Sequence, residues 1–187
     1  ENIYLPKDLE RYICISSAIT KQKAIIEFLK IYSKYRSIMN DQSLNLIIIG
    51  EGPLLEDCFK LCETLNLEFQ FNYLENNKNN NVIFTGHLDN PFPIIRKCSL
   101  FVMPSFYEGL SNQLLEAIYS GIPIMASDCP GNKFVYNQIY HDDLKYIDSN
   151  YLQLLPLIDS KANQLKWLKY LINHTKNFNL EKYNDGR

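Results

Sequence analysis

Short apolar runs alternate along this chain with stretches in which apolar residues recur at helical spacing. The run at 44–49 is almost continuously apolar, which is typical of a strand buried on both faces of a sheet. The predicted strands are 12–15, 44–49, 82–84, 100–103, 122–126 and a short last strand at 144–147. The predicted helices are 21–36, a helix that begins near Pro53, 93–98, 112–120 and 161–177. Because alternating strands and helices imply right-handed crossovers, we predict an α/β fold with a doubly wound, Rossmann-like parallel sheet over residues 1–187.

The composition excludes several classes of function. A net charge of −2 lacks the basic excess of a nucleic-acid surface, so we expect no nucleic-acid partner. No apolar run approaches the roughly 20 residues of a membrane span, and the sequence shows no signal peptide. Five cysteines, an odd number spread mostly through apolar runs, predict reduced thiols and a cytoplasmic protein. Cys58 and Cys62 share a helix face, where core packing is favoured over a metal site.

Four segments that follow predicted strands contain the residues best suited to bind a ligand. They are 50–52, 85–87, 105–112 and 127–131. The carboxyl ends of parallel strands meet at one edge of a sheet, and ligands bind there, so we expect these segments to form the site. Gly50 and Gly52 permit close backbone approach to a ligand, although the third glycine of a dinucleotide fingerprint is missing. His87 is the histidine that falls at a predicted strand end.

Two glutamates, Glu108 and Glu116, lie eight positions apart around a predicted helix start. Neither Ser111 nor Asn112 is followed three residues later by Glu or Gln, so the capping box is absent. The N–H groups of the first helical turn are therefore predicted to be free for an anion such as a diphosphate. The glutamates would supply acceptors for sugar and ribose hydroxyls. A solvated helix face explains the same residues, and both interpretations stay open.

Lys23 follows the first predicted strand and is placed near the same edge, with Lys21 close by. A lysine ammonium acts as a point charge on a phosphate. Taken alone, the residues favour the simpler interpretation of a surface lysine at a helix start.

Together these residues resemble the C-terminal, donor-binding domain of retaining glycosyltransferases of the GT-B fold, in glycosyltransferase family four. The similar segments run in the order of that family. They are the strand and turn at 46–53, the strand at 81–86, the two-glutamate motif at 101–117 and the strand at 121–127. The resemblance covers roughly residues 10 to 131.

The resemblance implies transfer of a hexosyl group from a UDP- or GDP-sugar to a glycan or glycolipid, with retention and without a metal or other cofactor. It implies that Glu108 contacts the donor sugar at the reaction centre. Lys23 would neutralise the diphosphate, Glu116 would bind the ribose and the backbone near Gly86 and His87 would lie beside the base. The implied binding residues are Lys23, Gly52, Gly86, His87, Gly109, Leu110, Ser111, Asn112 and Glu116.

The chain departs from the pattern of that family at several points. Ser17 and Ala18 stand where members of that family usually have a Gly and an Arg before the lysine that corresponds to Lys23. One of the two cations that would clamp the diphosphate is therefore missing. The segment at 132–150 lacks the usual glycine-containing strand. Because the chain begins with Glu1, we expect it to be part of a longer protein, whose N-terminal acceptor domain is absent here.

Two alternatives follow from these departures. One is a non-catalytic nucleotide-sugar binding module, which Ala18 favours. The other is a GT-B sugar-nucleotide epimerase, which the spacing of the two glutamates disfavours. Because many members of that family act on lipid-linked acceptors, peripheral association of the protein with the cytoplasmic face of the membrane stays open.

Overall fold

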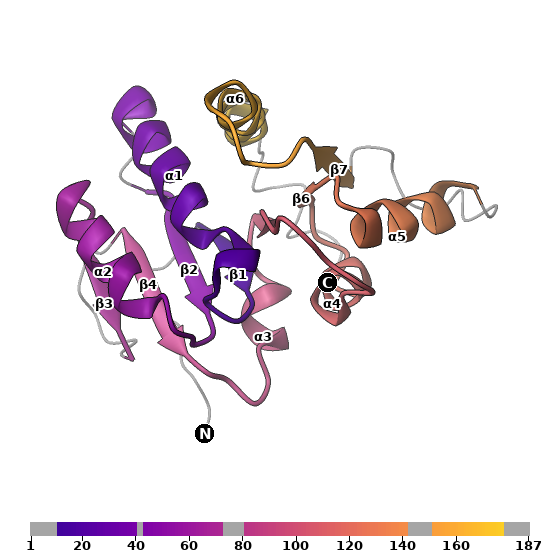
Figure 1. The fold of residues 1–187 in the computed structure, drawn as a ribbon, viewed down its shortest axis with the longest axis horizontal. Coiled ribbons are helices and arrows are strands. Elements are labelled where there is room, and N and C mark those ends of the chain that lie inside the picture. Colours follow the sequence, from indigo (N-terminus) through magenta and orange to yellow (C-terminus); the bar gives the residue numbers. More distant parts are fainter. Residues whose placement is uncertain (1–10, 41–42, 73–80, 142–150, 178–187) are drawn as a thin grey trace.

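The computed structural model describes residues 11–40, 43–72, 81–141 and 151–177, and these form one layered α/β fold (Figure 1). All seven strands pair in parallel, in the order β3-β4-β2-β1-β5-β6-β7. Their bounds are β1 Tyr12–Ser16, β2 Asn45–Ile49, β3 Phe69–Phe71, β4 Val82–Gly86, β5 Leu100–Met103, β6 Ile124–Ser127 and β7 Leu152–Leu155. The predicted doubly wound parallel sheet is confirmed.

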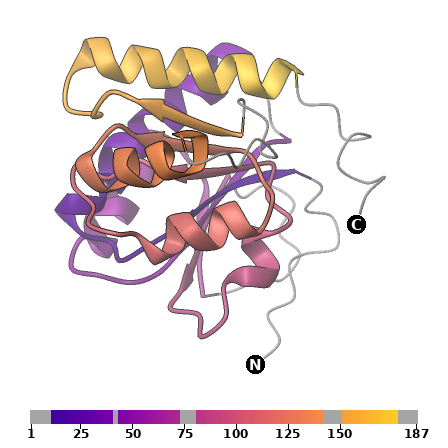
Figure 2. The same ribbon diagram turned by 90° about the vertical axis from the view of Figure 1, so that its right-hand side faces the viewer.

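Helices cover both faces of the sheet. Their bounds are η1 Lys21–Lys23 (a 3₁₀ turn), α1 Ile25–Met39, α2 Leu55–Thr64, α3 Phe92–Ile95, α4 Asn112–Tyr119, α5 Pro130–His141 and α6 Lys161–Asn177. In Figure 1, α1, α2 and α6 lie on one side of the strands and α3, α4 and α5 on the other. Figure 2 looks onto the side of α4 and α5, with α6 in yellow at the top.

The core is divided into two layers by the sheet, because successive side chains of a strand point to opposite faces. In β1, Ile13 and Ile15 pack with α1, α2 and α6, whereas Tyr12 and Cys14 pack with α3, α4 and α5. Trp167 of α6 is fully buried in the first layer. The two-sided burial of the central strands explains why their sequences read as continuous apolar runs.

Three elements were not predicted from the sequence, and each lacks a strong local signal. β3 is a three-residue edge strand, and β7 buries only the first and last of its four residues. α5 begins with Pro130 and Gly131, a pair that favours a turn. The strand predicted at 144–147 lies outside the described residues. The helix predicted at 161–177 is confirmed as α6.

All five cysteines are unpaired and buried. Cys58 and Cys62 pack between α2 and the sheet, and burial raises the pKa of each thiol to about 12. Among the described residues, no three His, Cys, Asp or Glu side chains gather as a potential metal site. No helix in the described segments is long and apolar enough to cross a bilayer.

Candidate functional site

The topology creates a crevice between β1 and β5. From β1 the chain crosses to β2 on one side, and from β5 it crosses to β6 on the other, so the loops after β1 and β5 diverge. A crevice at such a switch point, outside the carboxyl ends of the strands, is where open α/β sheets bind ligands. The segments predicted from the sequence to gather at one edge do meet there.

The loop after β1 is fixed by the glycine-containing turn that follows β2. Ile19 N–H donates to the carbonyl of Glu51 at 2.8 Å, and Leu54 N–H donates to the carbonyl of Ile19 at 3.1 Å. A Cβ at Gly52 would overlap the backbone of Ile19. Gly52 therefore allows the turn after β2 to pack directly against the backbone of Ile19, which occupies the space that a side chain at position 52 would need. A contact between Gly52 and a ligand stays a prediction.

Lys23 and Glu108 form a nearly buried ion pair, although 85 residues separate them in sequence. Lys23 Nζ lies 2.7 Å from Glu108 Oε1, and the two side chains are 15% and 6% exposed. The backbone around Glu108 is anchored to η1, because Phe106 N–H donates to the carbonyl of Gln22 at 2.8 Å. Gln22 Nε2 also donates to the carbonyl of Tyr107 at 2.8 Å. The structure thus brings together two predicted site residues and holds both in place.

The first turn of α4 is only partly capped. Ser111 is the N-cap residue, and its Oγ accepts a hydrogen bond from Leu114 N–H at 3.4 Å. The expectation of an entirely uncapped helix start is therefore wrong at this one amide. In the described part of the chain, no acceptor reaches the backbone N–H groups of Gly109, Leu110, Asn112 or Gln113. Leu110 is 65% exposed, so these free amides lie at an accessible helix start.

The loop after β6 packs against the backbone of Glu108 and Gly109. Gly131 N–H donates to the carbonyl of Glu108 at 3.2 Å, and a Cβ at Gly131 would overlap the carbonyl oxygen of Gly109. Ser127 Oγ donates to the carbonyl of Ser105, which joins the loops after β6 and β5. The predicted segment 127–131 therefore shapes the site through its backbone contacts.

A pocket of about 320 Å³ opens at the carboxyl ends of β1, β2 and β4, beside α4. Its lining residues are Ser16, Ser17, Ala18, Ile49, Gly50, Glu51, His87, Leu88, Pro91, Gln113 and Glu116. Of the predicted site residues, His87 and Glu116 line it, and Gly86 directly precedes His87. His87 N–H donates to Glu51 Oε1 at 3.3 Å, so the loop after β4 is tied to the glycine-containing turn after β2. Lys23 and Glu108 do not line this pocket.

The polar side chains of Ser17, Glu51 and Gln113 also line this pocket, and the sequence did not single them out as binding residues. The positions of Ser17 and Glu51 directly after strands were the available signal. Gln113 lies one turn before Glu116 on α4. Its place in the pocket lining depends on where α4 sits in the fold, which the local sequence does not show.

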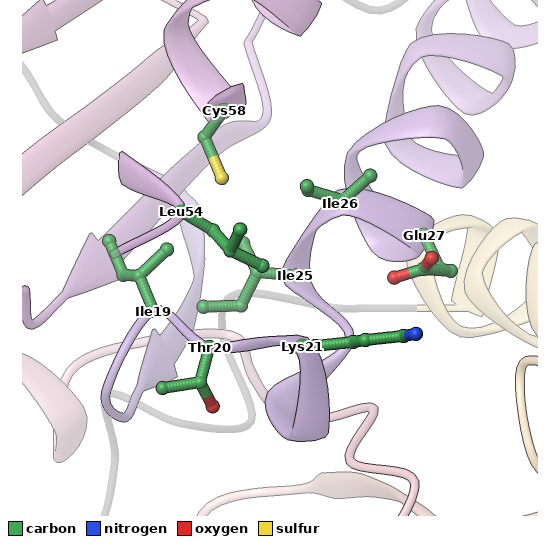
Figure 3. A pocket seen from close by; sticks show the side chains of 8 residues that line it. All are labelled: Ile19, Thr20, Lys21, Ile25, Ile26, Glu27, Leu54 and Cys58. Atoms are coloured by element: carbon green, nitrogen blue, oxygen red, sulfur yellow. The ribbon is translucent and has the colours of Figure 1, made fainter. Parts of the chain in front are cut away.

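A second, mostly apolar pocket of about 260 Å³ lies between the first turns of α1 and α2 (Figure 3). It is lined by Ile19, Thr20, Lys21, Ile25, Ile26, Glu27, Leu54 and Cys58. In Figure 3 the amine of Lys21 points away from the apolar side chains of Ile19 and Leu54. Of the two lysines placed near the site from the sequence, only Lys23 pairs with Glu108.

Comparison with known proteins decides the family. A model of the family described as glycosyl transferases group 1 matches residues 10–145. The chain belongs to this family of glycosyltransferases.

One curated relative of this glycosyltransferase chain is a Campylobacter jejuni N-acetylgalactosamine-N,N'-diacetylbacillosaminyl-diphospho-undecaprenol 4-alpha-N-acetylgalactosaminyltransferase. It is 24% identical over 167 residues, which cover 89% of this chain and 39% of the relative. This chain spans less than two thirds of the length of the curated relatives it matches.

Two solved structures share the fold of this glycosyltransferase chain. The pneumococcal O-GlcNAc transferase in complex with UDP and GlcNAc matches with a TM-score of 0.67 and 18% identity, over 91% of this chain and 30% of that one. The C-terminal domain of a glycosyl transferase group 1 family protein from Francisella tularensis matches with a TM-score of 0.59 and 21% identity, over 89% of this chain and 77% of that one. These matches support the GT-B type of Rossmann-like domain.

Proposed function

We propose that this chain is the donor-binding domain of a glycosyltransferase that moves a hexosyl group from a UDP- or GDP-sugar to a glycan or glycolipid, with retention. The observation that carries the proposal is the Lys23–Glu108 ion pair beside the free amides of α4, at the switch point of the sheet. A cation, a carboxylate and unpaired N–H groups in one crevice match the needs of a sugar joined to a diphosphate. The Campylobacter jejuni relative, whose name includes a diphospho-undecaprenol, supports the same class of reaction.

The diphosphate binds in this proposal at the first turn of α4. The free N–H groups from Gly109 to Gln113 are available to phosphate oxygens. The helix dipole adds roughly 0.3–2 kcal/mol for an anion at such a terminus. Lys23 supplies a full positive charge next to this position. In this proposal these groups meet the charge of the leaving diphosphate, and no metal ion is invoked.

Glu108 acts on the donor sugar in this proposal. Its carboxylate is 6% exposed, so a hydrogen bond from a sugar hydroxyl would form with little competition from water. The ion pair with Lys23 fixes its orientation before the donor arrives. As the sugar–phosphate bond breaks, positive charge develops on the sugar and negative charge on the phosphate, and Glu108 and Lys23 lie where they can stabilise these charges.

The nucleoside occupies the 320 Å³ pocket in this proposal, a volume within the range of roughly 300–1,000 Å³ found for small-molecule sites. Glu116 lines the wall formed by α4, where its carboxylate can accept hydrogen bonds from ribose hydroxyls. His87 also lines the pocket and Gly86 directly precedes it, and in this proposal the two lie beside the base. The acceptor, and any contact with the cytoplasmic face of a membrane, would then belong to another part of the protein.

A non-catalytic nucleotide-sugar binding module is the second candidate. Ala18 lines the pocket at the position where the resemblance implies an arginine, so the structure supplies no cation there. Loss of that charge would weaken stabilisation of the leaving diphosphate more than it weakens recognition of the nucleoside.

An NMR titration of this chain with UDP, GDP and their sugars tests donor binding. We expect the amide signals from Gly109 to Asn112 to shift on addition of at least one nucleotide. No shift at these amides with any nucleotide would overturn the donor site. Glu108→Gln in the full-length protein then separates the two candidates. Abolished transfer with retained nucleotide binding supports the enzyme, whereas a wild-type protein that binds donor without transfer or hydrolysis supports the binding module.

A further inference from the structure

The hydroxyl of Ser17 is a buried polar group without a partner. Its Oγ has no hydrogen-bond partner within the described chain, although the residue lines the nucleoside pocket at the end of β1. An unsatisfied buried hydroxyl costs stability, because folding removes its water without replacing the hydrogen bond. An unpartnered hydroxyl on a residue that lines a pocket is suited to donate to a ligand.

Gln113, which lines the same pocket, carries a second donor. Its Oε1 accepts a hydrogen bond from Ser111 Oγ at 3.1 Å, which directs its Nε2 amide away from the helix cap. Within the described residues, this Nε2 group donates no hydrogen bond. Gln113 lies in the first turn of α4, between the free amides and Glu116. An NH₂ group can only donate, so the natural partner here is an acceptor-only group such as a phosphate oxygen.

The charged side chains of this pocket do not supply a cation for a phosphate. Its acidic lining residues are Glu51 and Glu116, and no lysine or arginine lines it. Ala18 has no polar side chain, Lys21 lines the apolar pocket of Figure 3, and Lys23 is paired with Glu108. Hydrogen-bond donors to an anion in this part of the crevice therefore come from neutral groups.

We propose that the Ser17 hydroxyl and the Gln113 amide form a neutral clamp that donates hydrogen bonds to the diphosphate of the donor nucleotide. This proposal rests on the proposed function and names how this chain holds the diphosphate without a cation at Ala18. Both residues line the pocket, Ser17 after the end of β1 and Gln113 at the start of α4, which follows β5, so they come from the two sides of the switch point. The ribose hydroxyls are left to Glu116, one turn further along α4.

The clamp is tested with Ser17→Ala and Gln113→Ala in the full-length protein, by calorimetric titration with UDP, UMP and uridine and with the matching guanine compounds. A hydrogen bond to a charged group is strong enough for each variant to lose roughly tenfold or more in UDP affinity. Uridine has no phosphate, so its affinity should stay within twofold of wild type. Ser37→Ala, on the exposed side of α1, is the matched serine control and should bind as wild type does.

Thermal unfolding distinguishes a ligand-binding hydroxyl from a structural one. Because Ser17 Oγ has no partner in the free protein, Ser17→Ala should unfold at the same temperature or higher. A lower midpoint, UDP affinity equal to wild type, or an equal loss for UDP and uridine would each overturn the clamp. Gln113→Ala provides the same binding comparison at a half-exposed helix position, where folding is not at risk. If the wild-type protein binds none of the nucleotides, the proposed function itself fails.

Discussion

Removal of the charge of Lys23 should destabilise the fold much more than removal of the charge of Glu108. Two unit charges 2.7 Å apart attract by roughly 6 kcal/mol at an effective dielectric constant of about 20. Desolvation of both ions offsets most of this attraction, but a variant that leaves one ion buried and unpaired keeps the desolvation cost and loses the attraction. Lys23→Met keeps the aliphatic stem and leaves Glu108 as that buried ion, at 6% exposure.

We expect Lys23→Met to cost about 3 kcal/mol, at the lower end of the range for a broken buried pair, because Lys23 is partly exposed. Glu108→Gln should cost only about 1 kcal/mol, since the flexible lysine can turn its ammonium toward water. For a chain of this length, 3 kcal/mol corresponds to a fall of roughly 6–12 °C in the unfolding midpoint. The double variant should be more stable than Lys23→Met alone, because its neutral Gln is no longer an unpaired ion.

Urea unfolding of the wild type, both single variants and the double variant gives the coupling energy directly. Lys21→Met is the matched control, since Lys21 lies exposed on the same 3₁₀ turn, and it should stay within about 0.5 kcal/mol of wild type. Equal costs for the two single variants, or costs that simply add in the double variant, would refute the reasoning that Glu108 is held in a poorly solvated site by Lys23.

Three further variants test other parts of the structure. Ala18→Arg should tighten UDP binding by about tenfold and make it more sensitive to salt, as calorimetry at low and high ionic strength can show; unchanged affinity would mean that this position does not face the diphosphate. Gly131→Ala should cost more than 2 kcal/mol in urea unfolding, because its Cβ would overlap the carbonyl oxygen of Gly109; a smaller cost would mean that the loop yields easily. Burial lowers the pKa of His174, so the folded state favours the neutral ring while the unfolded ring takes up a proton below about pH 6.5. Stability should therefore fall as the pH drops through and below 6.5, and thermal unfolding of His174→Gln, which can still reach the carbonyl of Ser99, should show a weaker dependence between pH 7.5 and 5.5.

Local sequence patterns were sufficient to predict the central part of the fold. The strands that became β1, β2, β4 and β5 are buried on both faces, so their apolar runs carry an unambiguous signal. β3 is a short edge strand, and its pairing with β4 depends on a neighbour that a local pattern does not contain. The start of α5 is determined by the packing of Gly131 on Gly109, whereas the Pro-Gly pair itself favours a turn.

The candidate site could be predicted as a location more readily than as a set of contacts. The rule that ligands bind at the carboxyl edge of a parallel sheet placed Lys23 and Glu108 near each other, and the ion pair depends on how Gln22 anchors the loop after β5. The capping box was absent as predicted, but Ser111 still caps one amide through its own hydroxyl. Side-chain hydrogen bonds of this kind require only a suitable rotamer, so spacing rules cannot exclude them.

The charges around the crevice explain why hydrogen-bond donors matter more here than net charge. Glu51, Glu108 and Glu116 lie on or near it, whereas Lys23 is the cation that pairs within it among the described residues. An anionic nucleotide that enters such a crevice gains little from long-range attraction, because the carboxylates outnumber that cation. Its binding free energy must then come from short-range contacts: Lys23, the free amides of α4 and, in our proposal, the side chains of Ser17 and Gln113. Short-range donors are insensitive to salt, so a weak dependence of UDP affinity on ionic strength is the physical signature that separates this arrangement from a clamp built on arginine.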